Sequence, residues 1–162
     1  MQKKNSLIEI GFFLPMEKFD PKVQNEAWLR LKLLKGQLLN MIFCSAEFVI
    51  ELPDMVLTGN QITTGEPTWG TGNEIDANFK EALRRYAENR NICVHIATSW
   101  QHIPRAWLCF LLYRPSESWT VKFHRTKGNP FGYKNSLMEI PKILLELWLF
   151  QKKKLGKELA GN

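Results

Sequence analysis

Three strand-like segments rich in apolar residues follow one another closely, and they constrain the fold more than any other feature of the chain. They span residues 92–100, 106–113 and 119–126. The middle segment, 106–113, is apolar on both faces of an extended strand, which is typical of a buried central strand. The segment 119–126 alternates apolar and polar residues, as a strand with one wet face does. A short connection containing Pro115 joins these two segments, so we expect an antiparallel hairpin.

The remaining elements are predicted from periodicity and from helix end signals. Two earlier strands are expected at 7–13 and 41–52, where apolar residues alternate with polar ones. A helix is expected between Asp20–Pro21, which suit its start, and Gly36, which suits its end. Further helices are expected at about 74–89 and 140–157, while 53–72 is predicted as a long surface loop and 158–162 as a frayed terminus.

Together these elements predict one α+β domain over residues 1–162 with the order β-α-β-α-β-β-β-α. The sheet is expected to be largely antiparallel, with about five strands and with its helices packed on one face. A chain of 162 residues with 44% hydrophobic and 12% aromatic residues can bury a core and is unlike a disordered protein.

The cysteines predict no metal site and no disulfide framework. Cys44, Cys93 and Cys109 are odd in number and widely spaced, and no CxxC pair occurs. Each lies in an apolar segment, where a free thiol packs as a small core residue. We therefore expect no metal and no cofactor. We also expect no secretion signal and no membrane segment, and a cytoplasmic location.

Charge is divided unevenly along the chain. Residues 1–81 carry 8 Lys and Arg against 11 Asp and Glu, whereas residues 82–162 carry 14 against 5. The basic half coincides with the strand-rich half, so its charge lies on a folded scaffold. Such asymmetry indicates a partner that is a polyanion, either nucleic acid or an acidic protein.

The segment 118–138 has no acidic residue and mixes basic with aromatic side chains. Lysines and arginines neutralise phosphates, and exposed aromatic rings stack on unpaired bases. For Trp119 and Phe123 the alternative to base stacking is packing in the core, which strand alternation already explains. Phe131 and Tyr133 are predicted to stand on a surface turn, and the candidate nucleic-acid contacts are Lys122, Arg125, Lys127, Phe131, Tyr133 and Lys134.

The run Lys152–Lys153–Lys154 is a further candidate contact for a phosphate or an acidic protein. The alternative is a solvated helix end whose positive charges complement the helix dipole.

Two histidines carry the only catalytic hypothesis. If His95 and His124 share a sheet face with Lys122, two imidazoles could serve as acid and base while the lysine stabilises a phosphorane, which is enough for metal-independent RNA cleavage. Three histidines in the whole chain make this a weak signal. Strand-borne carboxylates such as Glu9 and Glu47 could hold a divalent ion, but the usual acid-x-Lys triplet is missing.

These observations leave three classes of function. The first is a non-catalytic protein that binds nucleic acid through the basic and aromatic residues of the C-terminal half. The second is a protein-interaction module, such as an inhibitor, an antitoxin-like or an immunity-like partner of a larger protein. The third is the small ribonuclease. Whether the protein is an enzyme stays open, and the absence of a catalytic motif favours binding.

Overall fold

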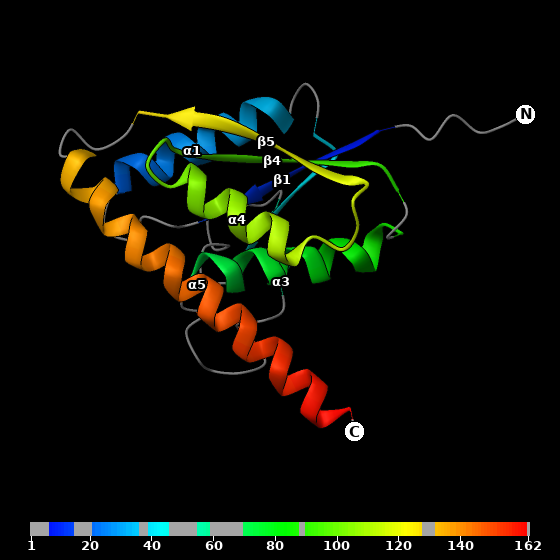
Figure 1. The fold of residues 1–162 in the computed structure, drawn as a ribbon. Coiled ribbons are helices and arrows are strands. Elements are labelled where there is room, and N and C mark those ends of the chain that lie inside the picture. Colours follow the sequence, from blue (N-terminus) through cyan, green and yellow to red (C-terminus); the bar gives the residue numbers. More distant parts are fainter. Residues whose placement is uncertain are drawn as a thin grey trace, which may run out of the picture.

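A computed structural model describes residues 7–14, 21–35, 39–45, 55–58, 70–87, 90–127 and 132–161. The chain alternates strands and helices through most of its length (Figure 1). In order, the elements are β1 (Ile8–Phe13), α1 (Pro21–Lys35), β2 (Met41–Ser45), β3 (Met55–Thr58), α3 (Thr71–Arg85), β4 (Ile92–Ser99), α4 (Ile103–Tyr113), β5 (Trp119–Thr126) and α5 (Gly132–Ala160).

The strands form one sheet in the order β3-β2-β1-β4-β5, and every neighbouring pair is parallel. The combination of helices with a sheet is therefore confirmed, but the antiparallel sheet predicted from the sequence is wrong. The reason is visible in β4, whose eight residues are all buried. Parallel strands are covered on both faces, so a continuous apolar segment is their ordinary signature.

The predicted hairpin is wrong because segment 106–113 is helical and belongs to α4. A short apolar run has the same composition in a buried strand and in a buried helix, and only its surroundings distinguish them. Pro104 lies in the first turn of α4, a position that favours a helix start. The helix carries the chain back along the sheet, so β5 pairs with β4 in parallel.

Helices cover both faces of the sheet, not one as the sequence predicted. Figure 1 shows α1 on one side, with α3 and α4 on the other and α5 lying outside them. On the α3–α4 side, Phe12 and Trp119 pack with Phe79 and Phe110 in the larger core. The smaller core lies beneath α1 and includes Phe13, Ala27, Leu31, Ile42 and Ala97.

Two further boundaries differ from the prediction. β3 lies inside segment 53–72, for which a continuous loop was expected. α5 begins at Gly132, before Pro141, and continues to Ala160 through the residues expected to fray. α5 packs against α4 through Phe150 and against α3 through Lys153, and its C-terminal end projects past the body of the fold (Figure 1).

Gly72 is required by a close approach between α3 and α5. Its amide donates to Glu146 Oε2 at 3.2 Å, and a Cβ there would lie 2.6 Å from that oxygen and 2.9 Å from the Tyr113 ring. We expect Gly72→Ala to lower the free energy of unfolding by about 1–3 kcal/mol in urea denaturation, because both neighbours must shift. Gly156→Ala is the control, because a Cβ added at Gly156 would have no neighbour within 4 Å and because a helix favours alanine over glycine. Equal stabilities of the two variants would contradict this packing.

Candidate functional site

A basic cavity of about 550 Å³ lies where α3, α4 and α5 meet. Among its described lining residues, four are lysines, one is a carboxylate and two carry aromatic rings. The lining residues are Asp76, Lys80, Leu112, Tyr113, Phe150, Lys153, Lys154, Gly156, Lys157 and Ala160. A volume of this size is in the range of ligand sites.

The helices bring these charges together through i, i+4 spacing. Lys80 follows Asp76 by one turn of α3, and Lys157 follows Lys153 by one turn of α5, so each pair shares a helix face. Asp76 is paired with both Lys80, at 3.0 Å, and Lys153, at 3.5 Å. Lys154 makes no ion pair with any residue in the part of the chain described here.

Tyr113 supplies a neutral hydroxyl to the cavity wall. Burial, with the nearby charges of Asp76 and Glu146, raises the pKa of Tyr113 to about 12. The ring packs edge to face against Phe150 at 5.2 Å, and Lys153 Nζ lies 5.3 Å from its centroid. The hydroxyl can therefore donate a hydrogen bond, whereas the ring is already engaged.

The structure separates the basic residues that the sequence grouped together. Lys153 and Lys154 line the cavity, but Lys152 lies over the Trp148 ring, 5.2 Å from its centroid. Lys122 and Arg125 are both exposed on β5. Because side chains alternate along a strand, those two lie on opposite faces of the sheet.

The predicted aromatic turn is not found as such. Tyr133 and Lys134 lie in the first turn of α5, so this part of the prediction is wrong. Phe131 lies outside the described residues. Lys127 is exposed just after β5, where its amide donates to Glu26 Oε1 of α1 at 2.9 Å.

His95, His124 and Lys122 do come together, on the α1 side of the sheet, and Glu9 joins them. His95 Nδ1 lies 2.7 Å from His124 Nε2, and the other His95 nitrogen lies 3.4 Å from Glu9 Oε1. Lys122 Nζ lies 3.5 Å from the same Glu9 oxygen. The imidazole planes differ by 10° with centroids 5.0 Å apart, which together with the short N···N distance describes coplanar rings joined edge to edge.

The surroundings of both histidines favour the uncharged imidazole. Burial lowers the pKa of His95, and Glu9 offsets this only in part. Burial, His95 and Arg30 together lower the pKa of His124. An acid–base pair must reach a substrate from two sides, but His95 is buried and both of its nitrogens face other side chains. This arrangement does not favour the two-histidine ribonuclease.

A third polar cluster was missed by sequence reasoning. Glu139 of α5 contacts His102 at 3.2 Å, Arg105 at 3.1 Å and Lys142 at 2.9 Å. Glu139, His102 and Arg105 are buried, close to the point where the chain passes from β4 into α4. His102 and Arg105 are three residues apart, as are Glu139 and Lys142, but no local pattern in the sequence connects one pair to the other.

Comparison with known proteins found no matching family model, no matching curated protein and no matching solved structure. Among the described helices, none combines the length and apolar character needed to cross a bilayer.

Proposed function

We propose that the protein binds nucleic acid by its phosphate backbone, and that the basic cavity between α3, α4 and α5 is the contact site. The observation that carries this is the convergence of four lysines on one cavity, Lys80, Lys153, Lys154 and Lys157, against one carboxylate among its described lining residues. Lysine ammonium groups neutralise phosphates without reading sequence.

The state of each lysine indicates how the contact would be made. Lys80 and Lys153 are held by Asp76, so they contribute fixed positive charge at the wall. Lys154 and Lys157 are exposed and extend the positive charge to the cavity rim. Because the Tyr113 and Phe150 rings pack against each other, base stacking is a minor contribution and sequence preference should be weak.

The test is fluorescence anisotropy with labelled single-stranded RNA, single-stranded DNA and duplex DNA at two salt concentrations. We expect Lys154→Glu/Lys157→Glu to weaken binding by about tenfold or more at low salt. Each phosphate contact that is lost means that binding releases fewer counterions. The slope of the logarithm of the binding constant against the logarithm of salt concentration should therefore become shallower by about 0.7 per contact for single strands.

The matched control is Lys32→Glu/Lys127→Glu, which changes the net charge equally at exposed positions on α1 and after β5. It should leave affinity within about twofold if the cavity is the site. Equal losses in the two variants, or binding insensitive to salt, would contradict the proposal. So would binding to vesicles of anionic lipid, lost in the cavity variant, without any binding to nucleic acid.

A protein partner is the second candidate function, and the outer surface of α5 favours it. Leu144, Trp148 and Leu155 are 62%, 55% and 59% exposed, and their spacing places them on one helix face. Exposed apolar stripes of this kind mark protein contacts. With the neighbouring lysines, they fit an acidic partner. Trp148→Asp should then abolish association with that partner while nucleic-acid binding survives, which separates the two functions.

A further inference from the structure

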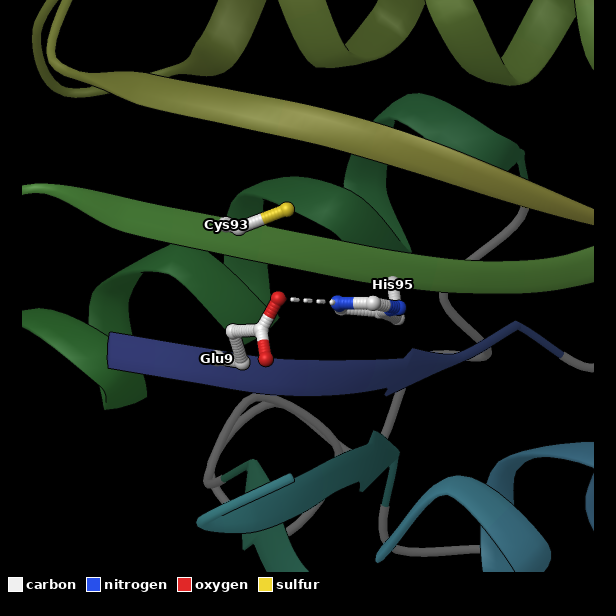
Figure 2. A group of neighbouring side chains, drawn as sticks. All are labelled: Glu9, Cys93 and His95. Carbon is white, nitrogen blue, oxygen red and sulfur yellow. Dashed lines mark hydrogen bonds and ion pairs between the residues drawn. The ribbon is translucent and has the colours of Figure 1, made fainter. Parts of the chain in front are cut away.

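Glu9, Cys93 and His95 gather on the α1 side of the sheet, far along the chain from one another but adjacent in space (Figure 2). A carboxylate oxygen, the thiol sulfur and an imidazole nitrogen all lie within 4.8 Å of one another. We propose that these three side chains form a binding site for a single zinc ion. This site is separate from the basic cavity and does not depend on nucleic-acid binding.

The backbone explains why the three meet. The parallel register places Glu9 of β1 directly beside Cys93 of β4, and His95 lies two residues further along β4 on the same face. Both strands are internal to the sheet, so the positions of these side chains are fixed by the ladder. Sites built on strands are held more accurately than sites built on loops.

The separation of Glu9 and His95 fits a shared metal better than a direct hydrogen bond. Their 3.4 Å distance is long for a hydrogen bond between nitrogen and oxygen. Two ligands about 2.0–2.1 Å from a tetrahedral zinc ion lie about 3.4 Å apart. With a zinc–sulfur bond of about 2.3 Å, the thiol must come to about 3.6 Å from both, a shift of about 1 Å at most from the present cluster.

The surrounding residues match what a zinc-bound histidine and thiolate need. When His95 Nε2 binds the metal, its Nδ1–H donates to His124 Nε2, which fixes the ring orientation as outer hydrogen-bond partners of metal-bound histidines do. Thr120 of β5 is the register neighbour of Cys93, and its hydroxyl, which donates to Ile92 O at 3.5 Å, can turn to the sulfur of a bound thiolate. Lys122, which is 60% exposed, can leave Glu9 for solvent as the cation enters.

The ligand set also selects the metal. One sulfur, one nitrogen and one oxygen suit zinc, whereas magnesium and calcium prefer oxygen alone. Binding converts the Cys93 thiol to a zinc-bound thiolate and releases its proton to solvent. Three protein ligands leave a fourth position for water, as in zinc sites that accept a ligand. The sequence predicted no metal because these residues have no zinc-like spacing.

The test uses the full chain without an affinity tag, freed of metal with a chelator and then titrated with Co²⁺ as a spectroscopic substitute for zinc. We expect saturation at about one ion per chain, with the absorption of a cobalt–thiolate bond and a tetrahedral visible spectrum. Zinc should displace the cobalt and raise the melting temperature.

Five variants locate the site. Cys93→Ala should remove the thiolate absorption, and His95→Asn should weaken binding at least about 100-fold, whereas Cys44→Ala and Cys109→Ala should retain the spectrum of the unaltered chain. His124→Asn should keep the thiolate absorption but weaken binding about 10–100-fold. Circular dichroism confirms that each variant is folded. No saturable binding by the unaltered chain, or a spectrum unaffected by Cys93→Ala, would overturn the proposal.

Discussion

Phe79→Ala is expected to lower the free energy of unfolding by about 3–5 kcal/mol, because it removes a large ring from the centre of the core. Phe79 projects from α3 and is only 2% exposed. Its ring contacts Phe12 of β1 at 5.1 Å, Phe110 of α4 at 5.4 Å and Trp119 of β5 at 5.5 Å. Removing it leaves a cavity where α3 and α4 pack against β1 and β5.

Leu83→Ala is the matched control, because it lies one turn further along α3 and is 38% exposed. It should cost less than about 1 kcal/mol. Urea denaturation followed by circular dichroism measures both variants, with an unchanged slope indicating that the denatured state is the same. If Phe79→Ala cost no more than Leu83→Ala, α3 could not pack on the sheet as described.

The elements that sequence predicts well are those whose local pattern has one interpretation. The strict alternation of residues 119–126 predicted the bounds of β5, and helical periodicity predicted a helix at about 74–89, where most of α3 lies. Phe110 was expected in the core and is 1% exposed, although it lies on a helix and not on a strand. Burial was predictable there because an apolar side chain is buried in either conformation.

Strand direction was not predictable, because it depends on the path of the chain between strands. Once 106–113 is taken as a strand, a short turn can join it only to an antiparallel neighbour. As a helix, the same segment spans the sheet and forces a parallel return. That ambiguous segment therefore decided the direction of β5 and the presence of α4 over one face of the sheet.

The candidate sites were only partly predictable for a related reason. Alternation correctly placed Lys122 and His124 on one face of β5, and the structure brings His95 to them. Glu9 and Cys93 join that face only because β1 and β4 are parallel neighbours. The cavity likewise combines the predicted Lys153 and Lys154 with Lys80 of α3, a residue 73 positions away from Lys153 that no local pattern connects to it.

Glu139→Gln is expected to destabilise the protein by about 3–5 kcal/mol at pH 7, because it leaves the charge of Arg105 buried without its partner. Glu139 and Arg105 are 4% and 7% exposed, and their side chains join α5 to the start of α4. Burial alone would raise the pKa of Glu139, but hydrogen bonds from His102 and Lys142 and the charge of Arg105 outweigh it and lower the pKa to about 2.

That lowered pKa gives the effect a defined pH dependence. An unfolded glutamate has a pKa of about 4.3, so the unfolded chain binds a proton at Glu139 before the folded one does. The stabilising contribution is therefore complete above about pH 5 and is lost as the pH falls from there to about 2. Urea denaturation at pH 7, 5, 4 and 3 measures the free energy of unfolding of the unaltered chain and of Glu139→Gln. The difference between the two should shrink from pH 5 to 4 and again from pH 4 to 3.

Glu158→Gln, an exposed change on the same helix, is the control. Its free energy of unfolding should stay within about 0.5 kcal/mol of that of the unaltered chain at every pH. A difference for Glu139→Gln that stayed constant down to pH 3 would show that its carboxylate is not held by the His102 and Arg105 cluster.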